Sequence, residues 1–169
     1  MKILDRGELV AESERIFVSN SRLPDAVALD LRAQIGAINV ATARLNDLLD
    51  DRGEDIVRDV MHQSIDLAER QVRDFIRDIP DGSWTGEAWM DGVRVGDERI
   101  CRVALKLTCD GDTLRFDYTG SSDQVDAAVN STISATVAGS AVPLYSFLCQ
   151  GDIDWNDGLK RCIDVFAPE

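Results

Sequence analysis

The sequence predicts an α+β fold, in which a helical first part precedes a β-rich second part. Apolar residues recur at spacings of three, four and seven between residues 25 and 77, which is typical of amphipathic helices. Between residues 100 and 118 apolar and polar residues alternate instead, which is typical of strands with one buried face. An uncharged stretch and a terminal strand-like run follow, so the order is helix, helix, strands, helix, strand.

Two long helices are expected in the first part, after a short one over residues 8–18. Residues 25–49 form the first long helix, and residues 50–53 end it. The second covers residues 54–77 and stops before Pro80. Because a short turn joins the two, an antiparallel helix hairpin is expected. The apolar positions expected to face inwards are Val27, Leu31, Ile35, Ile38, Leu45 and Leu48, then Val57, Val60, Met61, Ala68, Val72, Phe75 and Ile76.

An antiparallel β-meander is expected next. Residues 84–90 form its first strand, and Asp91-Gly92 is a turn signal. Residues 100–109 form the second strand, and residues 114–118 continue the alternation after another turn. The side chains expected on the buried face of these last two strands are Cys101, Val103, Leu105, Leu107, Cys109, Leu114, Phe116 and Tyr118.

The stretch 133–149 carries no charge, but its length and composition disfavour a membrane span. It has only 17 residues, is rich in Ser, Thr and Gly, and contains Pro143. A membrane helix needs about 20 apolar residues, so a buried helix is favoured. The strand-like run over residues 160–166 needs neighbouring strands to pair with.

The composition of the chain argues against some classes of binding partner. The chain has 169 residues, enough for one domain with a core, and a net charge of −13. That charge argues against nucleic acid and against an anionic membrane surface, since both need a basic face. The four cysteines include no Cys-x-x-Cys pair, and the N-terminal residues contain no apolar signal core. A cytoplasmic protein with reduced thiols is therefore expected.

The residues alone show no complete catalytic constellation. His62 is the single histidine and lies beside the apolar stripe of a predicted helix, where a surface position is favoured over a catalytic triad. The acidic groups at residues 50–51 and at Asp152, Asp154 and Asp157 lack the spacing and the closing glutamate of a calcium loop. Neither a P-loop nor Gly-x-Gly-x-x-Gly occurs. No metal site and no nucleotide site is predicted in this chain.

Residues 116–130, FDYTGSSDQVDAAVN, break a strand-like run at Gly120 and continue with small hydroxyl side chains. If a helix begins at Asp123 or Gln124, the loop offers N–H and hydroxyl groups to an anion. The alternative is that Ser122 or Asp123 simply caps that helix. The spacing of the residues favours the cap.

Four stretches resemble the hydantoinase B/oxoprolinase family, in the family's order and over nearly the whole chain. NSRLPDAVALDLRAQIGA resembles its N-x-R-x-P…D-L-x-A-Q segment, and IPDGSW resembles its L-P-D-G-aromatic turn. FDYTGSSDQVDAAVN resembles its F-D-F-T-G-[ST]-S-x-Q…N segment. WNDGLKRCIDVFAPE resembles its N-x-G-x-x-R-x-I-x-V-x-x-P-E-G run. Each motif alone is modest, but the ordered set is specific.

The resemblance implies an ATP-dependent enzyme. Family members include B subunits of hydantoinases, the C-terminal half of 5-oxoprolinase, and large subunits of acetone- and acetophenone-type carboxylases. They work with a partner of the hydantoinase A type, which binds ATP. In the hydrolases ATP phosphorylates the oxygen of a lactam or cyclic amide, because a phosphorylated imidate is a better electrophile than an amide, and water then opens the ring. In the carboxylases phosphorylation activates a ketone enolate and bicarbonate.

The chain also departs from the family pattern. Family B subunits are much longer, and the N-D-P and G-G-x-H-x-x-D stretches associated with a divalent metal do not occur here. We therefore expect residues 1–169 to be one segment of a larger hydantoinase B/oxoprolinase-type domain, with a helical part at 1–80 and a β-rich part at 83–169. The divalent metal and ATP are expected to bind outside this segment. The chain is expected to be inactive alone and to form an oligomer.

Five residues match the third family motif. They either line a pocket in the full enzyme or fix the corner between a strand and a helix, and the corner is the favoured interpretation. The activity expected is hydrolysis of a cyclic amide. The alternatives are an ATP-dependent carboxylase subunit and a non-catalytic binding or assembly module. The five residues, to which no catalytic role is assigned, are Asp117, Thr119, Ser121, Gln124 and Asn130.

Overall fold

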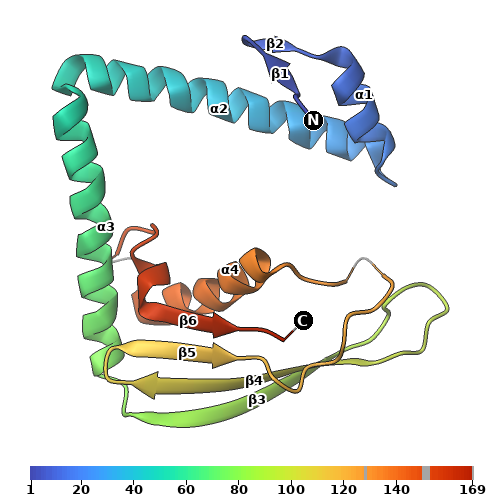
Figure 1. Ribbon diagram of the computed structural model, residues 1–169, viewed down its shortest axis with the longest axis vertical. Helices are drawn as coiled ribbons and strands as arrows, with labels where there is room; N and C mark the ends of the chain where they lie inside the picture. Colours follow the sequence, from blue (N-terminus) through green and yellow to red (C-terminus); the bar gives the residue numbers. More distant parts are fainter. Residues whose placement is uncertain (128, 150–152, 169) are drawn as a thin grey trace. The chain divides into compact units, whose positions relative to one another are not determined.

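The computed structural model describes residues 1–127, 129–149 and 153–168 (Figure 1). It has a mixed α+β architecture, as the sequence predicts. The chain divides into two compact units, Met1–Arg58 and Asp59–Glu169. The first unit contains a two-stranded sheet, and the second contains a four-stranded sheet.

The first unit begins with a small hairpin and continues with helices. β1 (Leu4–Asp5) pairs antiparallel with β2 (Glu8–Leu9), and α1 (Ala11–Ser19) follows. The helix expected over residues 8–18 therefore starts later, because its first residues pair with β1. α2 (Pro24–Arg52) has its proline in the first turn and ends at Gly53, whose φ of 83° favours glycine.

The apolar stripe of α2 is present but is largely exposed. Leu31 is the buried residue of this helix, near the place where α1 packs and Glu14 pairs with Arg32 at 3.2 Å. Farther along, Ile38 is 59% exposed and Leu48 is 45% exposed. Within the first unit, the second half of the α2 stripe is therefore exposed, which differs from the expectation that the whole stripe faces inwards.

The second unit contains the four-stranded sheet, preceded by α3 (Glu54–Arg77), which begins in the first unit. The expected antiparallel meander is present, and the terminal strand pairs parallel with the third strand of that meander. A parallel pair needs a crossover connection, which α4 (Ile133–Leu144) helps to supply. In sheet order the strands are β3 (Gly82–Met90), β4 (Cys101–Asp110), β5 (Thr113–Asp117) and β6 (Ile163–Phe166).

The core of the second unit lies between α3, α4 and one face of the sheet. The alternation predicted for β4 is confirmed at Cys101 and Cys109, which are buried, and at Arg102, which is exposed. Val103 was expected on the buried face, but it is 42% exposed. Ala104 was expected on the polar face, yet it is buried because residues 118–122 run across it. The largest fully buried side chains are those of Ile76, Leu114, Val72, Cys109 and Cys162.

The uncharged stretch forms α4 and then a π-helical turn over Tyr145–Cys149. α4 lies beside β6 (Figure 1), with Ser140, Ala141 and Leu144 buried. Within the described ranges, no helix has both the length and the apolar character needed to cross a membrane. The strand expected over residues 160–166 is shorter, because Leu159–Cys162 forms a 3₁₀ turn.

Candidate functional site

A cavity of about 550 Å³ lies in the second unit, beside the loop between β5 and α4. Its wall is formed by Tyr118, residues 121–125 and residues 129–131 of that loop, by the first turns of α4, by residues 101–103 of β4 and by residues 167–168. Small-molecule sites typically enclose roughly 300–1,000 Å³. We call this space the loop cavity and regard it as the candidate site.

Three of the five candidate residues of the third family motif line the loop cavity, namely Ser121, Gln124 and Asn130. Asp117 and Thr119 do not belong to its described lining. The fold thus brings part of the motif to one wall. A binding role for these residues remains a prediction.

Asp117 and Thr119 form a local turn where the chain leaves β5. A carboxylate oxygen of Asp117 accepts hydrogen bonds from the Thr119 N–H at 2.9 Å and the Thr119 hydroxyl at 2.6 Å. These bonds hold the pKa of the Asp117 carboxyl below its ordinary value, because they favour the charged form. Gly120 follows with a φ of 92°, which favours glycine. This turn fixes the direction of the loop.

The next two serines dock the loop on β4. The Ser121 hydroxyl accepts from the Ala104 N–H at 3.0 Å and donates to the Ala104 carbonyl at 3.2 Å. The Ser122 hydroxyl accepts from the Arg102 N–H at 2.8 Å, and the Ser122 N–H donates to the Arg102 carbonyl at 2.8 Å. The loop therefore satisfies β4 backbone groups beyond the end of β5.

The expectation that Ser122 or Asp123 caps a helix is wrong. Residues 123–127 are not helical, and α4 begins at Ile133. Thr132 is the cap, since its hydroxyl accepts from the Ala135 N–H at 3.2 Å. Ser122 cannot serve as that cap because its side chain is engaged by β4.

Asn130 closes the loop through its side-chain amide. The amide oxygen accepts from the Val125 N–H at 3.0 Å. The amide nitrogen donates to the carbonyls of Val125 at 2.6 Å and Ala127 at 3.0 Å. Asparagine suits this position because one short side chain supplies both donor and acceptor. The residue therefore both lines the cavity and holds the shape of its wall.

Ion pairs tie the β3–β4 connection to the same loop. Asp126 pairs with Arg99 at 2.9 Å and with Arg94 at 3.1 Å. The hydrogen bond from Arg99 is the main reason that the pKa of the Asp126 carboxyl lies below its ordinary value. Asp97 pairs with Arg99 as well, and its carboxyl pKa is lowered for the same reason. The connection is thus held beside the cavity loop.

The wall of the loop cavity is mainly neutral. Arg102 contributes to the wall, but its guanidinium pairs with Glu87 at 2.9 Å and lies 5.9 Å from the ring centre of Trp89. Asp123 is an exposed carboxylate on the wall. Hydroxyl, carboxamide and apolar side chains make up most of the remaining lining. This chemistry suits a small polar ligand with an apolar body.

The described residues bring together no group of three or more His, Cys, Asp or Glu side chains that fits a metal ion. His62 is exposed on α3, as predicted. Asp157 pairs with Lys160 at 2.7 Å, while Asp152 lies outside the described residues. No metal role is assigned to side chains of this chain.

The fourth family motif docks the chain end on α3. Asn156 donates to the Ser64 carbonyl at 3.2 Å and accepts from the Gly158 N–H at 2.8 Å. Gly158 lies directly against the α3 backbone, so an added Cβ would stand 2.7 Å from the nitrogen of Glu69. Arg161 pairs with Asp66 at 2.8 Å and with Glu69 at 3.1 Å. The Asn-x-Gly-x-x-Arg spacing is therefore structural, a role that the sequence did not reveal.

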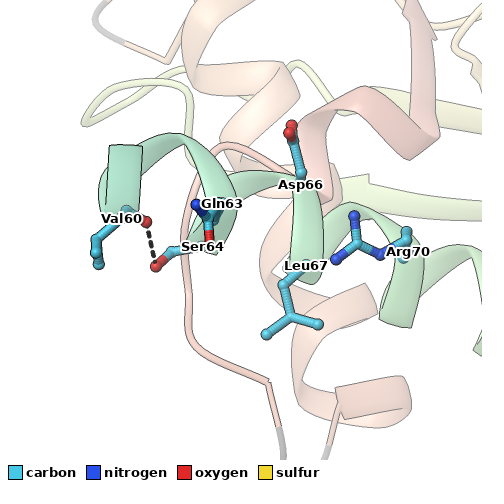
Figure 2. A pocket seen from close by; sticks show the side chains of 6 residues that line it. All are labelled: Val60, Gln63, Ser64, Asp66, Leu67 and Arg70. Atoms are coloured by element: carbon cyan, nitrogen blue, oxygen red, sulfur yellow. Dashed lines mark hydrogen bonds between the residues drawn. The ribbon is translucent and has the colours of Figure 1, made fainter. Parts of the chain in front are cut away.

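A second hollow of about 310 Å³ follows one face of α3 (Figure 2). Ser64 donates to the Val60 carbonyl at 2.8 Å, and Asp66 and Leu67 point in opposite directions. Its polar groups do not converge on one point, so the loop cavity is the better candidate. The described lining of the hollow is Val60, Gln63, Ser64, Asp66, Leu67 and Arg70.

The comparison with known families agrees with the four motifs and with the fold around them. The hydantoinase B/oxoprolinase family matches residues 1–169. The chain therefore belongs to the hydantoinase B/oxoprolinase family, and the resemblance inferred from the motifs is confirmed.

Two relatives are named as subunits of enzymes. The chain is 30% identical over 178 residues to the putative B subunit of a D-/L-hydantoinase from Pseudomonas sp. strain NS671, covering 100% of this chain and 30% of that protein. It is 23% identical over 175 residues to the acetophenone carboxylase delta subunit of Aromatoleum aromaticum, covering 96% of this chain and 25% of that protein.

A solved structure has the same fold. The crystal structure of ATP-dependent caprolactamase from Pseudomonas jessenii matches with a TM-score of 0.80 and 27% identity. The match covers 100% of this chain and 29% of that chain. The chain thus spans about 30% of the length of the curated relatives it matches.

Proposed function

We propose that this chain contributes to an ATP-dependent enzyme that opens a cyclic amide, as part of a subunit of the hydantoinase B type. The observation that carries the proposal is the match to ATP-dependent caprolactamase over the whole chain, at a TM-score of 0.80. Relatives named as subunits support a partner subunit, which we take to be of the hydantoinase A type and to bind ATP.

The loop cavity is the proposed binding place for the ring. A cyclic amide presents one N–H donor and one carbonyl acceptor on an apolar ring. Gln124 and Thr136 offer both donors and acceptors, and Met90 and Val103 offer apolar contact. ATP supplies the activation of the amide oxygen. The residues of this chain bind and orient the ring, and the purified chain alone does not hydrolyse it.

Binding to the purified chain tests this proposal. We expect caprolactam to shift the backbone amide signals of Ser121, Gln124 and Asn130 in an NMR titration, and to leave α2 signals unchanged. Replacing Gln124→Ala removes one exposed carboxamide from the wall. Loss of one hydrogen bond of roughly 0.5–1.5 kcal/mol should weaken binding about two- to tenfold. Gln34→Ala, on the exposed face of α2, is the matched control and should bind normally.

The other results decide between the alternatives. Stronger shifts with acetophenone than with caprolactam would favour an ATP-dependent carboxylase, as in the relative from Aromatoleum aromaticum. Absence of shifts with both ligands would favour a non-catalytic binding or assembly module. Ring opening with ATP by the purified chain alone would overturn the expectation that the activity needs further polypeptide.

A further inference from the structure

β3 is a long free edge of the four-stranded sheet. It pairs with β4 along nine residues, from Gly82 to Met90, and no other described strand pairs with it. A free edge presents unpaired N–H and C=O groups, which form a template for another strand. The opposite edge, β6, has only four residues and includes Asp164. The two edges therefore differ in their capacity to recruit a strand.

Most of the usual protections of an edge are missing from β3. Lysine, proline, a bulge or a short length normally prevents edge-to-edge pairing. The β3 sequence GSWTGEAWM contains neither lysine nor proline, and Glu87 is its single charged residue. Its register with β4 runs from Gly82 opposite Cys109 to Met90 opposite Cys101 without interruption. Backbone pairing is therefore geometrically open along the whole strand.

The inward face of β3 also alternates large and small side chains. Trp84 is 46% exposed and Met90 is 36% exposed on this face. Gly82, Gly86 and Ala88 lie between and beside them. Large exposed apolar groups next to small residues leave gaps that a complementary strand fills.

We propose that β3 is a dimer interface, in which β3 of a second copy pairs antiparallel about a twofold axis at Gly86. In this register Trp84 lies opposite Ala88 of the second copy, and Gly82 lies opposite Met90. A large side chain therefore meets a small one at each of these positions. A twofold interface requires such a self-complementary surface. The proposal is independent of the proposed enzymatic function.

The outward face is compatible with the same register. Ser83 lies opposite Trp89 of the second copy, and Thr85 lies opposite Glu87, so no two carboxylates face each other directly. The two Glu87 side chains are diagonal neighbours across the axis. Each is matched by its own Arg102 at 2.9 Å. The Glu87 side chains therefore do not prevent the two strands from pairing, even though the net charge of the chain is −13.

A single substitution at the axis tests the proposal. A Cβ added at Gly86 meets nothing within 4 Å, so Gly86→Lys leaves the monomer undisturbed. In the dimer it places two lysines opposite each other. We expect a concentration-dependent dimer for the wild type and a monomer for Gly86→Lys in sedimentation equilibrium. Gly36→Lys makes the same exchange on the exposed face of α2 and should remain dimeric.

A cross-link reports the register itself. Gly86→Cys places two thiols opposite each other at the axis, and mild oxidation should give a disulfide-linked dimer above the wild-type background. Gly36→Cys should not. A wild-type chain that stays monomeric at every concentration would overturn the proposal. A Gly86→Lys variant that still dimerises would also overturn it, because the interface would then lie elsewhere.

Discussion

Gly158 is glycine because of space, not because of its backbone angles. Its φ of −59° and ψ of −36° are open to any residue. A Cβ there would stand 2.7 Å from the Glu69 nitrogen and still closer to the Ile65 carbonyl oxygen. Both atoms belong to the α3 backbone, which does not move aside as a flexible side chain does. The close contact between position 158 and the α3 backbone therefore requires a residue without a Cβ atom.

We expect Gly158→Ala to lower the free energy of unfolding by about 1–3 kcal/mol, the usual cost of overpacking. Chemical denaturation measures it directly. Gly139→Ala in α4 is the matched control, since its Cβ meets nothing within 4 Å. That control should raise stability by about 0.5–1 kcal/mol, because alanine favours the helix. Equal stability of Gly158→Ala and wild type would mean that the chain end does not rest on α3 as described.

Arg73 joins separate elements into one charged network. It pairs with Glu69 at 2.9 Å, pairs with Asp112 in the β4–β5 turn at 2.9 Å, and donates to the Arg161 carbonyl at 2.9 Å. A hydrogen bond from Arg77 is the main cause that lowers the pKa of the Asp112 carboxyl, and one from Arg73 lowers that of Glu69. The network therefore links α3, the sheet and the segment before β6.

These lowered pKa values predict acid sensitivity. The ordinary values are 3.8 for Asp112 and 4.5 for Glu69. The unfolded chain binds protons at higher pH than the folded chain, so the stabilisation is present above these values and is lost as the pH falls through the lowered folded values. We expect the melting temperature to drop below about pH 4, and to drop less for Asp112→Asn.

The control for this pH profile is Asp59→Asn, an exposed α3 carboxylate outside the network. Its melting temperature should follow that of the wild type at every pH. A profile for Asp112→Asn that runs parallel to wild type would show that the Arg73 network does not couple proton binding to folding.

Elements that depend on local pattern could be predicted from the sequence, and those that depend on distant partners could not. The alternation of residues 101–109 and the limits of α3 follow from side-chain period and from turn residues. The helix expected to begin at Asp123 or Gln124 is absent, because the hydroxyl of Ser122 resembles a cap in the sequence but bonds Arg102, 20 residues away. The parallel pairing of β6 with β5 likewise depends on contacts between segments that are far apart in the sequence.

The candidate site was predicted in part for the same reason. Ser121, Gln124 and Asn130 lie in one continuous motif, so the family resemblance found them together. Cys101 and Thr136 also line the loop cavity but come from β4 and α4. The spacing of residues in the sequence does not predict that these segments meet, because it is the sheet and the crossover connection that bring them together. The period-two alternation did place Cys101 on the inward face of β4.

At the scale of the whole molecule, burial is concentrated in the second unit. Every residue of the main core cluster lies between Ala68 and Cys162. Among the described residues of the first unit, Leu31 and Val57 are the buried apolar side chains. Most of the apolar stripe of α2 therefore adds little to stability by burial. Local stability should differ strongly along the chain.

Hydrogen–deuterium exchange measures that difference. We expect amides in the second half of α2 to exchange much faster than those of β4, because helices without packed apolar faces open readily. Exchange should be followed at low and high protein concentration, since association through β3 would slow only the amides of that strand. Gly86→Lys is the control for that concentration effect. Protection of α2 equal to that of β4 would contradict the prediction, and would show that its exposed stripe, including Ile38 and Leu48, is covered in solution.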